Sequence, residues 1–160
     1  MLHNVYGPNC DFSPGKSQVI PSLIFKSLTQ PSEKPSIVWG SGTLLREFLH
    51  VDDLGQAVVF ALENWDPSAM NAPLDNSGVP LNFLNVGSGK DISIKDFSKK
   101  IAQYSGFDGK IAWDSTKPDG TPKKQLDCKR LNNLGWNAQI NLDEGLKETI
   151  SNYMANIKHT

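Results

Sequence analysis

The chain has 160 residues, a formal net charge of −1 and 38% hydrophobic residues. That length suits one domain with its own core and is too short for two full ones, so residues 1–160 are expected to form a single unit. The near-neutral charge argues against nucleic acid as a partner, and the lack of a long apolar run argues against a membrane span, so we expect a cytoplasmic protein.

The cysteines and histidines have no metal-ligand spacing. Cys10 and Cys128 lie far apart with no C-x-x-C pair, and His3, His50 and His159 are scattered along the chain. A zinc ribbon or a dithiol redox motif needs closely spaced ligands or thiols, which are absent here. No metal site is predicted.

The predicted elements alternate between strands and helices. In chain order they are a strand at residues 2–6, a helix at 19–28, strands at 37–39 and 44–50, a helix from 52, a strand at 81–86, a helix from 94, a strand at 110–113 and helices at 127–134 and 142–157. This interleaving without an internal repeat indicates an α/β fold.

Three local predictions concern the middle of the chain. The link at residues 40–43 has hairpin length, so the strands on either side are expected to pair with each other. Asp52 is expected to cap the following helix, because its carboxylate can accept from N–H groups of the first turn. That helix carries a wide apolar stripe and is expected to be largely buried; the stripe consists of Leu54, Ala57, Val58, Ala61 and Leu62.

Motifs for complete phosphate binding or catalysis are missing. Gly15-Lys16-Ser17 ends like a P-loop, but Cys10 stands where the first glycine is needed. The two G-x-G pairs at residues 40–42 and 87–89 lack the third glycine of a dinucleotide fingerprint. No Tyr-x-x-x-Lys pair is present either, so no catalytic residue is predicted.

Two stretches could hold a charged, ring-bearing ligand. Arg46 lies near the expected hairpin tip, where its guanidinium could bind a diphosphate, and Trp39 on the paired strand could pack against a base or sugar. In the second stretch, Asp119 within a Pro-Asp-Gly turn could accept from ribose hydroxyls, and Lys123 or Lys124 could face phosphate. Spacing alone favours a surface hairpin and a solvated loop at these two places.

Five motifs that occur in a fixed order favour ligand binding at these two stretches over a surface hairpin and a solvated loop. They are NVYGP at residues 4–8, QVIPSL at 18–23, VWGSGTLLREFLHVDDL at 38–54, LNVGSG at 84–89 and KPDGTPKKQLD at 117–127. Together they resemble the C-terminal half of the GDP-L-fucose synthase family, a group of extended short-chain dehydrogenases/reductases. The resemblance implies a nucleotide-sugar-binding region whose strands complete a Rossmann-type parallel sheet. It also implies that the Rossmann half, with the catalytic Ser, Tyr and Lys of the family, is not part of residues 1–160.

The family resemblance also implies roles for individual positions. Lys26, Trp39, Arg46 and Asp119 match residues that contact the GDP-sugar, with Lys110 and Lys124 as weaker candidates. The residues on the NADP side are Leu2, His3, Asn4, Val5 and Gln18. Leu2-His3 replaces the usual Pro-Thr, so backbone contacts are expected there.

Gln18 departs most sharply from the family, which has a proton-donating histidine at this position. A carboxamide can hydrogen-bond a ligand but has no proton to give near neutral pH, so epimerisation is expected to be impaired. Family members are homodimers, and uncovered apolar strand edges predict a partner half or self-association. Two alternatives remain: another nucleotide-sugar epimerase or dehydratase, and a non-catalytic fragment or assembly module.

Overall fold

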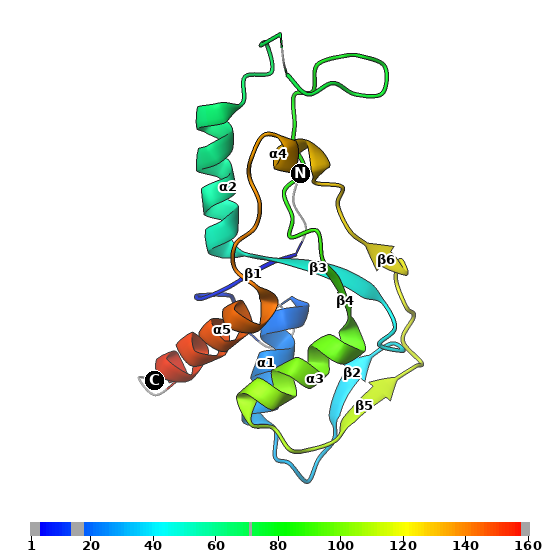
Figure 1. Cartoon of the computed structure of the whole chain (residues 1–160). Helices are drawn as coiled ribbons and strands as arrows, with labels where there is room; N and C mark the ends of the chain where they lie inside the picture. Colours follow the sequence, from blue (N-terminus) through cyan, green and yellow to red (C-terminus); the bar gives the residue numbers. More distant parts are fainter. Residues whose placement is uncertain (1–3, 14–17, 71, 158–160) are drawn as a thin grey trace.

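The computed structural model describes residues 4–13, 18–70 and 72–157. In chain order (Figure 1) its elements are β1 (Asn4–Tyr6), α1 (Val19–Thr29), β2 (Ser36–Trp39), β3 (Leu45–His50), α2 (Val51–Asn64), β4 (Asp91–Ser93), α3 (Ile94–Ser105), β5 (Ile111–Asp114), β6 (Lys123–Lys124), α4 (Lys129–Asn133) and α5 (Leu142–Ile157). The alternation of strands and helices confirms the predicted α/β class.

Strand β3 organises the larger sheet. It pairs in parallel with β1, where Asn4 lies opposite Phe48, in antiparallel with β4 and in parallel with the short β6. Strands β2 and β5 form a separate two-stranded parallel sheet. The predicted hairpin between β2 and β3 is therefore wrong, because these neighbours in sequence belong to different sheets.

The glycines of the link between β2 and β3 explain this outcome. Gly40 and Gly42 have φ values of 83° and 77°, a region that favours glycine. Gly40 N–H donates to Asp114 O at 2.9 Å, which prolongs the ladder with β5 and prevents a tight return. Gly42 then passes against the Trp113 ring, where a Cβ would lie 2.6 Å from the nearest ring carbon.

Alternating side chains of β3 serve two separate cores. Phe48 packs into the cluster built with α1, α3 and α5, and its ring stacks on Phe97 with centroids 4.5 Å apart. Leu49 points to the other side, into a smaller cluster with Ala57 and Trp136. Figure 1 shows the corresponding arrangement, with α1, α3 and α5 below β3 and α2 and α4 above it.

Side chains fix the starts of two helices. Ser93 caps α3, with Ser93 Oγ accepting from Asp96 N at 3.0 Å. The predicted cap of α2 by Asp52 is wrong, because His50 is the capping residue and its Nδ1 accepts from Asp52 N at 3.3 Å. His50 is buried at the strand-to-helix junction, and this position lets its ring reach the first turn.

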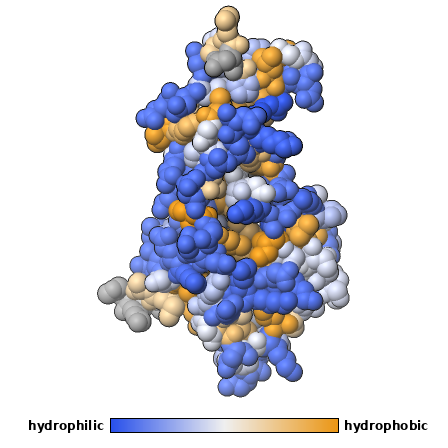
Figure 2. Space-filling model, in the orientation of Figure 1, coloured by the Kyte–Doolittle hydropathy of each residue, from blue (hydrophilic) through white to orange (hydrophobic). Residues whose placement is uncertain are grey.

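Helix α2 differs from its prediction as a largely buried helix. Only Asp53 and Ala57 are buried, and Leu62 is 81% exposed. The apolar residues of α2 span a wide arc of its surface, and the small cluster around Leu49 covers only part of that arc. In Figure 2, orange and tan residues interrupt the hydrophilic surface at the upper left, where Figure 1 draws α2.

Residues 81–86 do not form the predicted strand. Leu81 and Leu84 are buried, but within the described ranges the segment has no continuous ladder and only Val86 takes part in a bridge. Apolar alternation by itself does not make a strand, because the backbone also needs a hydrogen-bonding neighbour. The segment buries Leu81 and Leu84 without pairing as a strand.

Candidate functional site

The turn after Trp39 is held by a carboxylate from a distant loop. Asp119 Oδ1 accepts from Ser41 N at 2.9 Å, and a Cβ at Gly40 would collide with the same oxygen. Hydrogen bonds from Ser41 and the nearby charge of Arg46 hold the pKa of Asp119 below its usual value. Two stretches that lie 78 residues apart in sequence are thus fastened together.

Trp39 presents its indole to solvent at the end of β2. The side chain is 70% exposed, which is unusual for a tryptophan without a partner surface. Lys117 Nζ lies 5.4 Å from the ring centroid, within the range of a cation–π contact. Lys117 is not among the predicted site residues, although its place two residues before Asp119 in the same turn could have identified it.

Arg46 lies on β3, close to the fastened turn. It is half-buried, its Nη1 donates to Leu45 O at 2.7 Å, and its register partners are Ile92 on β4 and Lys124 on β6. A Cβ on Gly120, the residue after Asp119, would lie 3.7 Å from Arg46 Nη2, which places the guanidinium beside the loop that carries Asp119. Arg46, Asp119 and Lys124 therefore gather near the turn that follows Trp39.

The two remaining lysines differ in their relation to this cluster. Lys26 reaches from α1 to β2, where its Nζ donates to Ile37 O at 2.9 Å. The carbonyl of Lys110 accepts from Ser36 N at the far end of the β2–β5 ladder, opposite the end that carries Trp39. The structure therefore brings Lys26 alongside β2 and leaves Lys110 away from the turn.

Three of the residues predicted on the NADP side meet at one small depression. Asn4, Val5 and Gln18 line it, together with the first residues of α1 and Phe48. Asn4 Nδ2 donates to Glu47 O at 3.0 Å, and Gln18 is exposed with no side-chain cap bond to α1. The other two predicted residues, Leu2 and His3, lie outside the described residues.

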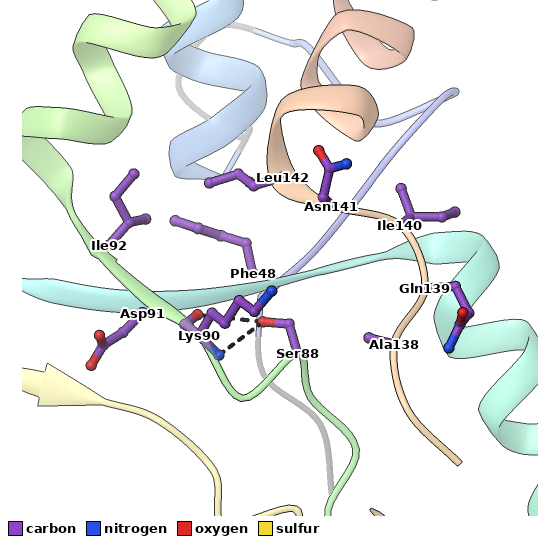
Figure 3. A pocket seen from close by; sticks show the side chains of 10 residues that line it. All are labelled: Phe48, Ser88, Lys90, Asp91, Ile92, Ala138, Gln139, Ile140, Asn141 and Leu142. Carbon is purple, nitrogen blue, oxygen red and sulfur yellow. Dashed lines mark hydrogen bonds between the residues drawn. The ribbon is translucent and has the colours of Figure 1, made fainter.

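A larger groove lies beside β3 and was not predicted (Figure 3). Its volume is about 270 Å³. Side chains of Phe48, Ile92 and Leu142 point toward one another on one side, and Ser88 and Lys90 form a polar edge opposite. The G-S-G sequence at residues 87–89 was the available signal for a tight loop here.

Glu47 holds the loop that borders this groove. Its carboxylate is buried, and it accepts from Gly89 N at 2.6 Å and from Leu126 N at 2.8 Å. A Cβ at Gly87 would collide with Glu47 Oε1, so glycine is required for this approach. Glu47 thus links β3, the 87–89 loop and the segment that carries Lys124.

Metal-ligand clusters and membrane-spanning helices are both missing from the described parts of the chain. Residues 4–13, 18–70 and 72–157 contain no group of three or more His, Cys, Asp or Glu side chains arranged to hold a metal ion. Over the same ranges, every helix is too short or too polar to span a bilayer.

Known proteins resemble this chain over nearly its whole length. The family model for the NAD dependent epimerase/dehydratase family matches residues 1–72. The chain is 41% identical over 159 residues to probable GDP-L-fucose synthase 1 of Oryza sativa subsp. japonica, covering 98% of this chain and 44% of the relative. It is also 41% identical over 158 residues to GDP-L-fucose synthase of Escherichia coli K12, covering 98% of this chain and 48% of that protein. The chain thus spans about half the length of the curated relatives it matches.

Solved structures support the same relationship. A GDP-6-OMe-4-keto-L-xylo-heptose reductase from C. jejuni superposes with a TM-score of 0.83 at 27% identity, over 97% of this chain and 53% of that one. A GDP-L-fucose synthetase from Naegleria fowleri, solved with NADP bound, has a TM-score of 0.81 at 22% identity over 98% and 46% of the two chains, which supports the fold alone. By sequence and by fold, the chain is similar to the C-terminal half of the GDP-L-fucose synthases.

Proposed function

We propose that this chain forms the GDP-sugar-binding part of an enzyme of the GDP-L-fucose synthase type. The observation that carries the proposal is the fastening of the Gly40–Gly42 turn by Asp119, because it sets an exposed Trp39 and the Arg46 guanidinium beside one turn. An indole face suits a nucleobase, and a guanidinium suits a diphosphate.

The other predicted substrate residues take supporting roles in this proposal. Lys124 adds positive charge next to Arg46 for the diphosphate. The second carboxylate oxygen of Asp119 is the candidate acceptor for a ribose hydroxyl, because Oδ1 already accepts from Ser41 N. Lys26 approaches from α1 on the β2 side.

The activity proposed for the complete enzyme is conversion of GDP-4-keto-6-deoxy-D-mannose to GDP-L-fucose, by epimerisation at C3 and C5 and NADPH-dependent reduction at C4. The chain has no Tyr-x-x-x-Lys pair, so alone it is expected to lack reductase activity. The depression at Asn4, Val5 and Gln18 supplies amide groups over a small area, which fits one end of NADP and not a whole cofactor site. When bound, NADPH supplies the hydride, and these residues would orient its nicotinamide end.

Calorimetric titration of the chain with GDP tests the proposal. Trp39→Ala and Arg46→Ala are each expected to weaken GDP binding about 10-fold or more, since stacking of a base on an aromatic side chain contributes about 1–3 kcal/mol and a charge-assisted hydrogen bond about 1.5–3 kcal/mol. Arg130→Ala is the matched control, because Arg130 is an exposed arginine on α4. Equal binding of GDP by all four proteins would contradict the proposed site.

The same titration separates the main alternative. Tighter binding of UDP or dTDP than of GDP would indicate another nucleotide-sugar epimerase or dehydratase. A non-catalytic assembly module is the second alternative, and it is favoured for the isolated chain by the missing Tyr-x-x-x-Lys pair. Oxidation of NADPH by the isolated 160 residues would exclude that alternative.

A further inference from the structure

A turn that follows β5 carries Lys117 to the ring of Trp39. Asp114, the last residue of β5, is the register partner of Trp39 at the end of the β2–β5 ladder (Figure 1). The carbonyl oxygen of Asp114 accepts from Gly40 N at 2.9 Å and from Lys117 N at 3.3 Å. The turn that holds Lys117 is therefore tied to the strand end that holds Trp39, and this fixes the distance between their backbones.

The carboxylate of Asp114 stabilises this turn. Its Oδ1 accepts from Thr116 N at 3.1 Å, and the Thr116 hydroxyl donates to the same oxygen. These hydrogen bonds hold the pKa of Asp114 below its usual value, and the charge of Lys117 lowers this pKa further. The carboxylate is therefore ionised at neutral pH, where it orders the backbone from which the Lys117 side chain extends.

The Lys117 ammonium covers one face of an indole that is otherwise open. Its Nζ lies 5.4 Å from the ring centroid, and Trp39 is still 70% exposed. An exposed indole on its own samples several rotamers, and immobilising such a side chain when a ligand binds lowers the affinity. A cation over the ring reduces that cost, because the contact restricts the indole before the ligand arrives. The face away from Lys117 stays available to a planar ligand.

We propose that Lys117 is a positioning residue of the nucleobase site, which holds the Trp39 indole so that a base stacks on the face away from the ammonium. This proposal rests on the proposed function, because it requires Trp39 to be the residue that contacts the base. Lys117 does not contact the base itself, since the indole lies between them. It acts through the ring, whereas Arg46 and Lys124 are proposed to meet the diphosphate directly.

The test compares guanosine with GDP as ligands of the 160-residue chain, followed by NMR titration of the indole N–H signals. A residue that acts on the base through Trp39 affects both ligands equally, whereas a residue that attracts phosphate affects GDP alone. Lys117→Met is expected to weaken the binding of both ligands about 2- to 5-fold, the factor for an exposed cation–π contact. Lys117→Arg is expected to bind like the wild-type chain, because a guanidinium also stacks on an aromatic face.

Lys147→Met is the matched control. Lys147 is an exposed lysine on α5 whose Nζ lies 5.1 Å from the Tyr104 ring centroid, so this variant removes the same kind of contact elsewhere in the chain. Its affinity for both ligands is expected to equal that of the wild-type chain. A double-mutant cycle then isolates the pair. In a Trp39→Ala background, Lys117→Met is expected to cause no further loss of GDP affinity, because the ammonium has no ring to hold.

A measurement without ligand keeps this proposal separate from the proposed function. NMR relaxation of the Trp39 indole N–H, whose signal is identified by its loss in Trp39→Phe, is expected to show a more mobile ring in Lys117→Met than in Lys117→Arg. Equal ring mobility in these two variants, unchanged affinity in Lys117→Met, a loss confined to GDP, or a further loss in the Trp39→Ala background overturns the proposal. GDP binding that Trp39→Ala leaves unchanged, with the ring still restricted by Lys117, rejects the proposed function alone.

Discussion

The buried Glu47 carboxylate accepts a hydrogen bond from the backbone N–H of Gly89, 2.6 Å away. Its second oxygen accepts from Leu126 N at 2.8 Å, so one side chain on β3 secures two loops. Both loops belong to the region around the candidate site, because one borders the groove and the other continues from Lys124.

Replacing Glu47 by glutamine is expected to lower the free energy of unfolding by about 1–3 kcal/mol, because a carboxamide has one acceptor oxygen and leaves one buried N–H without an acceptor. Urea denaturation measures this change. Glu63→Gln, at an exposed position of α2, is the control and should change stability by less than about 0.5 kcal/mol. Equal stabilities of the two variants would show that the Glu47 contacts contribute nothing.

Gly87 and Gly55 should respond to alanine in opposite directions. A Cβ at Gly87 would collide with the hydrogen-bonded Glu47 Oε1, so Gly87→Ala is expected to destabilise the fold by about 1–3 kcal/mol. Gly55 lies inside α2 with nothing within 4 Å of an added Cβ, so Gly55→Ala is expected to stabilise by about 0.5–1 kcal/mol. Thermal unfolding of both variants checks the signs, and a stabilised Gly87→Ala would contradict this packing.

The contact between Asp119 and Ser41 should depend on pH. Hydrogen bonds from Ser41 lower the pKa of Asp119 from the ordinary 3.8, so the stabilisation is fully present above 3.8 and is lost as the pH falls through the lower, folded-state pKa. The amide proton of Ser41 in NMR spectra should therefore shift with a midpoint below 3.8. In Asp119→Asn that shift should disappear, and a midpoint at or above the ordinary value would contradict the assignment.

Gln18 should limit epimerisation once the chain is completed by an N-terminal half. A positioned general acid contributes roughly 10²–10⁴-fold, so Gln18→His is expected to increase incorporation of solvent deuterium at C3 and C5 of the substrate by a factor of that order. Mass spectrometry of the sugar measures the exchange. Gln18→Asn is the control with no titratable group, and equal exchange by the wild-type protein and the Gln18→His variant would reject a proton-transfer role for this position.

Local patterns predicted the helices well. The helices at residues 19–28 and 142–157 were predicted correctly, because the spacing of apolar residues that indicates a helix depends on residues within one or two turns. The cap of α2 was misassigned to Asp52, since His50 takes this role only when the strand-to-helix junction buries its ring.

The pairing of the strands and the arrangement of the candidate site depend on contacts between residues that are distant in sequence. Nothing near Gly40 in sequence shows that Asp114 and Asp119 will meet it, so the hairpin prediction failed and the role of Asp119 in fastening the turn was not foreseen. The motifs predicted GDP-sugar contacts at Trp39, Arg46 and Asp119, and in the structure these three residues lie near one turn.

The sequence by itself determined the α/β class, the positions of the helices and the relationship to the GDP-L-fucose synthases, because these follow from local periodicity and from motif order. Tertiary structure alone decided that β2 and β3 lie in separate sheets, that Glu47 and Asp119 are loop anchors, and that α2 leaves an apolar side in solvent. These outcomes depend on which distant groups satisfy the hydrogen bonds and cover the surface of each element, and a linear pattern does not specify those partners.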